Sequence, residues 1–258
     1  MRLATTTLLI LAQSLLAGSA VGAVLSAEQV KITTEDKLVL VADLYRPPKA
    51  EGIAPAALLV HDAGGSRADM AELAERLAKQ GFAVLVPDLR GHGQSVGPQA
   101  KAWKDMSAEE QQKFWAFATR DLSAAANFLR KDEHIHASNL SLLGYLAGST
   151  LVARHALRDE NVRCVVLLGP KAEQLGFNLQ ADLEALGGLP TYIGAVKETK
   201  GDAEFLAVAA SDANGGLDFV QIEIFKALVA NPVEDKRLPA DIAKWMMDQA
   251  VPKKGKSR

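Results

Sequence analysis

The stretch Leu140-Ser141-Leu142-Leu143-Gly144-Tyr145-Leu146-Ala147-Gly148 decides the fold of this chain. Its first four residues are largely apolar and predict a buried strand. Gly144 and Gly148 flank a sharp turn, because glycine lets the backbone bend and lie close to its neighbours. Helical spacing follows from Ala147 onward. The stretch therefore predicts a strand, a tight turn and the start of a helix, with Leu146 at the apex of the turn.

Strands and helices alternate around this stretch. A polar turn joins two short strands at the N-terminal side, which predicts an antiparallel hairpin. Later strands are apolar along most of their length and are separated by helices, as in a largely parallel sheet covered on both faces. The predicted strands are 30–33, 38–45, 56–60, 82–86, 140–143, 162–168, 191–196 and 217–225, and the predicted helices begin at Ser66, Ser107, Ala147 and Pro239.

This order of elements resembles the α/β-hydrolase superfamily, particularly its small members similar to dienelactone hydrolase and to secreted esterases. Three motifs over roughly residues 28–250 carry the likeness. Residues 58–65 (LLVHDAGG) resemble the strand and H-G-x-G-G loop, residues 86–95 (VPDLRGHGQS) resemble the D-x-R-G-x-G-x-S turn, and the turn at Leu146 resembles G-x-S-x-G. The resemblance implies an α/β fold of about eight mostly parallel strands, with an N-terminal antiparallel hairpin, helices on both faces and no lid domain.

The chain departs from the family where the chemistry should be. The family's triad runs serine, acid, histidine along the chain. Leu146 occupies the serine position, and no histidine follows His155. Glu198 and Asp202 remain as possible vestiges of the acid. Loss of the nucleophile or the base costs about six orders of magnitude in kcat, so we expect serine-hydrolase activity to be lost.

The oxyanion loop is also altered, because the family's His-Gly is His61-Asp62 here. A carboxylate at this place opposes the negative charge that an oxyanion hole stabilises. We therefore expect a protein that binds a small apolar molecule or a protein partner at the former active-site face, with an open, shallow floor. The candidate binding residues are His61, Asp62, Ala63, Tyr145, Leu146 and Ala147.

A rearranged active site is the alternative. His61, Asp62, Asp88 and His92 follow neighbouring strands and could hydrolyse ester-like bonds. Their family counterparts are mainly structural, so we predict no metal site and no cofactor. Ser149 lies nearly one helical turn beyond Leu146 and is expected to point away from it. Trp103, Phe114 and Trp115 are expected to be core residues.

The N-terminal sequence predicts that the protein is exported. Residues 1–23 have a positive start, an apolar segment and a small-residue cleavage site, as in a secretory signal peptide. An uncleaved anchor is the alternative, because residues 3–27 carry no charge. With cleavage, residues 28–250 form one secreted or periplasmic domain without a membrane span, and residues 251–258 form a basic tail. The net charge of −2 does not favour nucleic acid as a partner.

Overall fold

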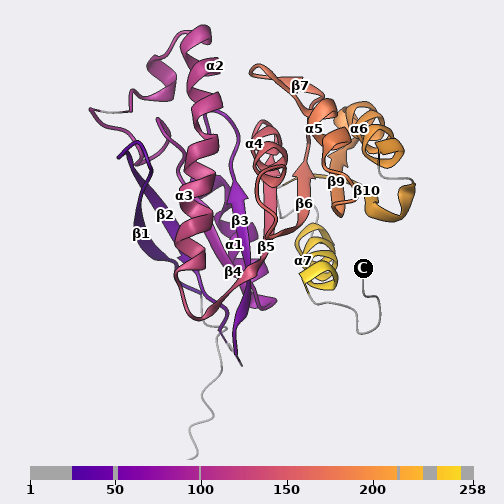
Figure 1. The fold of residues 1–258 in the computed structure, drawn as a ribbon, viewed down its shortest axis with the longest axis horizontal. Helices are drawn as coiled ribbons and strands as arrows, with labels where there is room; N and C mark the ends of the chain where they lie inside the picture. The colour runs from indigo at the N-terminus through magenta and orange to yellow at the C-terminus, as the bar shows by residue number, and fades with distance from the viewer. Residues whose placement is uncertain (1–24, 49–51, 99, 214–215, 229–236, 251–258) are drawn as a thin grey trace, which may run out of the picture.

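A computed structural model describes residues 25–48, 52–98, 100–213, 216–228 and 237–250. Within this part of the chain, an eight-stranded sheet forms the centre of the molecule (Figure 1). β1 and β2 pair antiparallel, β2 pairs antiparallel with β4, and the remaining strands run parallel. In spatial order the strands are β1 (Glu28–Thr33), β2 (Val39–Tyr45), β4 (Ala83–Pro87), β3 (Ala54–Val60), β5 (Ile135–Tyr145), β6 (Val162–Leu168), β9 (Thr191–Val196) and β10 (Val220–Phe225).

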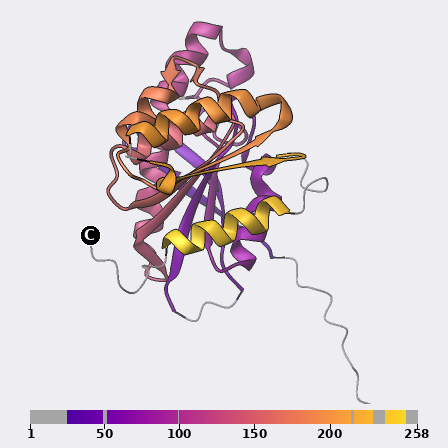
Figure 2. The ribbon, with the colours of Figure 1, turned by 90° about the vertical axis from the view of Figure 1, so that its right-hand side faces the viewer.

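Helices cover both faces of the sheet, as the apolar strands require. One face carries α3 (Thr119–Arg130), α4 (Gly148–Ala156), α5 (Leu179–Ala185) and α6 (Lys200–Ala213) over the larger apolar core. The other face carries α1 (Ala71–Lys79) and α7 (Arg237–Ala250) over the smaller core. Figure 2 shows α6 and α7 on opposite sides of the sheet. The predicted fold class is therefore confirmed.

Three predicted elements differ from the observed ones. The helix expected from Ser107 divides at Ala118 into α2 (Ala108–Phe117) and α3, and Phe117 at the end of α2 is exposed. The last strand begins at Val220, because residues 217–219 form a 3-10 turn. β5 begins five residues earlier than predicted, since Ile135 and His136 pair with the start of β3 before a shift in register. Pairing between distant segments decides the start of β5.

Short excursions rise beyond the carboxyl ends of the parallel strands (Figure 1). They are α2, which follows β4, and a small hairpin of β7 (Glu173–Gln174) and β8 (Phe177–Asn178), which follows β6. The hairpin contacts α2 closely, because a Cβ on Gly176 would lie 2.7 Å from Nε2 of Gln112. The segment between β6 and β9, where the sequence predicted no lid domain, thus holds this hairpin and α5 (Leu179–Ala185).

Among the described residues, no helix combines the length and the apolar character needed to cross a bilayer. The predicted signal peptide and the basic tail lie outside the described residues.

Candidate functional site

The turn between β5 and α4 has the backbone of a nucleophile elbow. Leu146 has φ +49°, a left-handed conformation that costs a branched L-residue energy and that strained elbows adopt. The glycines of the motif are required sterically. A Cβ on Gly144 would lie 2.5 Å from the backbone of Ser149, and one on Gly148 would lie 2.5 Å from the carbonyl oxygen of Val60. The elbow is therefore intact as a fold element and carries a side chain that cannot attack a carbonyl.

The side chain of Leu146 packs against apolar neighbours at the place where a triad would meet. A Cβ on Gly169 would lie 2.7 Å from Cδ2 of Leu146 and 2.9 Å from Cδ1 of Leu228. Leu228 is buried and follows β10, in the segment where the family places its histidine. Leucine thus occupies both the serine position and the neighbourhood of the missing base.

The principal oxyanion donor is already engaged. In this fold, the N–H of the residue after the nucleophile stabilises the oxyanion. Here the N–H of Ala147 donates to Oδ1 of Asp62 at 3.0 Å. The carboxylate therefore sits where the oxygen of a substrate would bind, and it adds negative charge to the site. Burial and the carboxylates of Asp62 and Asp69 raise the pKa of the neighbouring Tyr145.

The two possible vestiges of the acid lie outside this arrangement. Glu198 is in a 3-10 turn directly after β9, where the family places its acid, and Asp202 is in the first turn of α6. Both side chains are exposed.

His61 orients loops through both ring nitrogens. Its Nε2 accepts a hydrogen bond from the N–H of Leu89 at 3.1 Å, so the proton resides on Nδ1, which donates to the carbonyl oxygen of Asp62 at 2.6 Å. The ring is fully buried, and burial lowers its pKa. His61 is thus a neutral group with no nitrogen left to accept a proton from a substrate.

His92 repeats the same pattern one loop away. Its Nε2 accepts from the N–H of Gly64 at 3.0 Å, and its Nδ1 lies 2.9 Å from the carbonyl oxygen of Arg90. Burial lowers its pKa to about 4. Its ring centroid lies 5.0 Å from that of His61 and 4.7 Å from that of Trp103. The two imidazoles therefore link the loops after β3 and β4 into one packed unit.

The three aromatic residues behave as the sequence predicted. Trp115 is buried, while Trp103 and Phe114 are partly buried and pack against the larger core. The indole N–H of Trp115 donates to Oγ1 of Thr150 at 3.1 Å, and Thr150 donates to the carbonyl oxygen of Ala147 at 2.8 Å. These bonds tie α2 to the start of α4.

Asp88 also has a structural role. It is fully buried, accepts hydrogen bonds from the backbone N–H groups of Arg67 (2.8 Å) and Gln94 (2.7 Å), and forms an ion pair with the guanidinium of Arg67. These contacts satisfy both carboxylate oxygens. Asp88 thus holds the loop after β4 against the start of α1.

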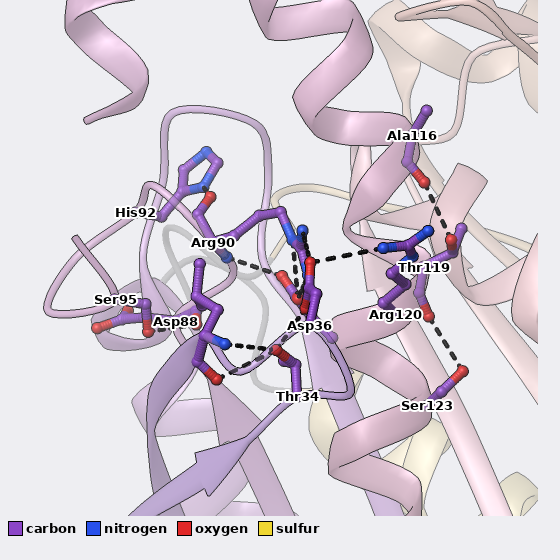
Figure 3. Close-up of polar contacts among 12 residues, drawn as sticks. Thr34, Asp36, Asp88, Arg90, His92, Ser95, Ala116, Thr119, Arg120 and Ser123 are labelled. Carbon is purple, nitrogen blue, oxygen red and sulfur yellow. Dashed lines mark hydrogen bonds and ion pairs between the residues drawn. The ribbon is translucent and has the colours of Figure 1, made fainter. Parts of the chain in front are cut away.

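A second buried ion pair holds the other side of the same loop (Figure 3). Nε and Nη2 of Arg90 donate to Oδ1 of Asp121 at 2.9 and 2.6 Å, and Nη1 donates to Asp36 at 2.9 Å. The Arg90 hydrogen bond is the largest influence on Asp36 and holds the pKa of that carboxyl at about 2. The network joins the turn after β1, the loop after β4 and α3.

Ser149 does not replace the lost nucleophile. It is fully buried, and its hydroxyl donates to the carbonyl oxygen of Gly144 at 3.1 Å. Its hydroxyl is therefore held by a backbone carbonyl of the elbow motif itself.

The pockets of the described surface lie away from the elbow, and the described residues form no cluster of metal ligands. Four pockets on the described surface lie between α1 and α7, between α2 and the β7–β8 hairpin, beside α3, and between α5 and α6. Leu146 lines none of them. Within the described ranges, no three His, Cys, Asp or Glu side chains are grouped so that they could hold a metal ion.

Comparison with known proteins identifies the class of this fold and site. The Dienelactone hydrolase family matches residues 40–185, more than half of the chain, so the protein belongs to this family. It is an α/β-hydrolase-fold protein with a dienelactone hydrolase-like domain. No curated protein matches.

Several solved structures of similar fold are described as esterases or hydrolases. An esterase from Pyrococcus furiosus is 16% identical, with a TM-score of 0.69 over 88% of this chain and 92% of the esterase. A thermophilic carboxylesterase cloned from a metagenomic library is 16% identical, with a TM-score of 0.67 over 89% of this chain and 91% of its own. An α/β hydrolase from a Penicillium species is 13% identical, with a TM-score of 0.67 over 88% and 99%. At these identities the likeness shows the fold.

Two residues of the site were not singled out in the sequence. Gly169 has φ +63° and follows β6, and Leu228 follows β10. A buried apolar residue carries no chemical signal, so Leu228 could be found only from its position after the last strand.

Proposed function

We propose that this protein is a secreted or periplasmic member of the Dienelactone hydrolase family that has lost serine-hydrolase chemistry and acts by binding. The observation that carries the proposal is the hydrogen bond from the N–H of Ala147 to the carboxylate of Asp62. It combines with Leu146 at the elbow, so the nucleophile and the principal oxyanion donor are both unavailable for acyl transfer.

The contacts of the histidines argue against a rearranged hydrolase. A general base needs a nitrogen or oxygen that can accept a proton from the attacking group. His61 and His92 each use both ring nitrogens on backbone partners, and Asp88 uses both oxygens on backbone N–H groups and Arg67. Asp62 alone faces the elbow, and it is bound to Ala147.

The ligand of such a site differs from an ester substrate. Tyr145 and Leu146 are both half-buried and offer apolar surface, while the carboxylate of Asp62 repels anions. These features favour a neutral, apolar small molecule at the elbow, with the apolar surface of a protein partner as the other possibility. The N-terminal sequence supports export, because residues 1–23 have the composition of a signal peptide.

A fluorophosphonate probe tests the loss of chemistry. We expect no covalent labelling of the purified protein and no turnover of a p-nitrophenyl ester, under conditions that label an active esterase of the same fold. The variant Leu146→Ser is the informative control. It restores the hydroxyl without a base, so we expect it to stay unlabelled as well. Labelling of the unchanged protein at any serine would sink the proposal.

Binding and export need separate measurements. A neutral apolar dye such as Nile red should gain fluorescence with the unchanged protein and lose most of that gain with Leu146→Lys, whereas an anionic dye should bind weakly to both. Equal binding of the neutral dye to both proteins would place the ligand elsewhere.

After expression with its own N-terminus, the exported protein should begin near residue 24 by mass. An intact N-terminus in the membrane fraction would favour the anchor.

A further inference from the structure

The two edges of the sheet differ in their surface. β1 forms one edge, and its exposed side chains are polar: Glu28, Gln29, Lys31 and Thr33. β10 forms the other edge and pairs only with β9 among the described strands. Figure 2 shows β10 at the front of the sheet, between α6 and α7. It exposes Ile222 (36%) and Ile224 (37%).

The β10 edge lacks three of the features that keep a strand edge from pairing, although it carries one charged residue, Glu223. Edge strands are usually protected by lysine, proline or a bulge. β10 contains no lysine or proline, and its register with β9 runs unbroken over six residue pairs. An open strand edge presents backbone N–H and C=O groups, and these are matched best by another strand. The occupant that fits this edge is therefore an extended segment with an apolar face.

We propose that β10 pairs antiparallel with β10 of a second copy of this chain, about a twofold axis at Ile222. Residues directly opposite in such a pair point to the same face of the sheet. Two opposite residues must therefore both have even numbers or both have odd numbers, which places the twofold axis at a residue. With Ile222 on the axis, Val220 lies opposite Ile224 of the other copy. Val220, Ile222 and Ile224 of both strands then form one continuous stripe on the α6 side.

Charge selects this register over the next one along the strand. With Ile222 on the axis, Gln221 lies opposite Glu223 of the other copy, and an amide can donate to that carboxylate. The register centred on Glu223 instead sets two carboxylates directly opposite, which is unfavourable.

Sedimentation equilibrium of the full chain without its signal peptide tests the dimer. We expect a mass twice that of one chain at micromolar concentration, and a fall to the monomer mass for Ile222→Lys. Val208→Lys is the matched control, because Val208 is a more exposed apolar residue (58%) on α6, beside α5 rather than on β10. A monomer up to about 1 mM, or a dimer that Ile222→Lys leaves intact, would overturn the proposal.

Disulfide trapping tests the register. In the proposed pair Ile222 lies opposite itself, at a Cα separation of ~4.5–5.5 Å that a disulfide spans. Two copies of Glu223 are offset by two residues and lie beyond the ~7 Å limit. Under mild oxidation, Ile222→Cys should form a covalent dimer and Glu223→Cys should not. The native Cys164 is buried and does not compete. Equal cross-linking of both variants, or of neither, would overturn this register.

Discussion

The loop after β4 and the elbow after β5 both correspond to motifs of the family. They differ in which features of the motif this chain retains. In the loop after β4, the buried polar groups Asp88, Arg90 and His92 all have partners within the protein. At the elbow, the backbone conformation is kept while Leu146 stands at the nucleophile position and Asp62 accepts the hydrogen bond of the Ala147 N–H. The loop residues support the fold, whereas Leu146 and Asp62 depart from the family motif.

The difference shows that the two roles are separable. Removing one partner of a buried ion pair lowers the free energy of unfolding by several kcal/mol. The contribution of the loop residues to stability is therefore sufficient to explain why they are present. A serine or histidine at the surface of a cleft contributes little to stability, so its replacement costs the fold little. The comparison predicts large stability effects in the loop and small ones at the elbow.

The largest effect should come from Asp121→Ala. Asp121 is fully buried against Arg90, which is 4% exposed, so the substitution removes the buried partner of the guanidinium and leaves it only the more exposed Asp36. We expect a loss of about 3–5 kcal/mol in the free energy of unfolding by urea at pH 7. Glu109→Ala is the control, because it breaks an exposed ion pair with Lys113 and should change stability little. If the two variants lose the same amount, the loop network does not support the fold.

A smaller effect should appear on acidification. His92 has a pKa of about 4 in the folded protein and a reference value of 6.5. The unfolded chain therefore binds this proton first, and stability falls as the pH decreases from about 6.5 to 4, by about 3 kcal/mol. Urea unfolding across this range measures it. Asp36, with a pKa of about 2, titrates below this window.

His92→Gln provides the control for this pH dependence. The glutamine carbonyl can still accept the N–H of Gly64 but does not titrate. We expect the slope of stability against pH to flatten between pH 6.5 and 4. An unchanged slope would assign the effect to other groups.

The smallest effect should come from the elbow. Leu146 is half-buried at φ +49°, a conformation that β-branched residues adopt with difficulty. Leu146→Val should therefore cost about 1 kcal/mol more than Leu146→Met, which keeps an unbranched Cβ. Thermal unfolding of both variants checks the difference. Equal melting temperatures of the two variants would mean that residue 146 leaves the left-handed conformation when it is substituted.

Much of the fold could be predicted from the sequence because it rests on local patterns. The antiparallel hairpin of β1 and β2, the strand Thr191–Val196, and the helix start at Ser107 all follow from alternation or from short motifs and were found as predicted. The division of the helix at Ala118 could not be predicted, because helical spacing continues through it. Contacts between distant residues, such as Trp115 with Thr150, are invisible in a local pattern.

Some features of the candidate site also follow from the sequence, whereas others depend on the tertiary structure. The absence of a serine at residue 146 and of any histidine after His155 is a property of the sequence alone, since no folding can supply a missing functional group. Only the tertiary structure decided that Asp62 occupies the donor of Ala147, that both imidazoles are used by the backbone, and that Leu228 reaches Gly169 beside Leu146. Composition limits the chemistry that a chain can perform, whereas hydrogen bonds between separate loops depend on three-dimensional geometry.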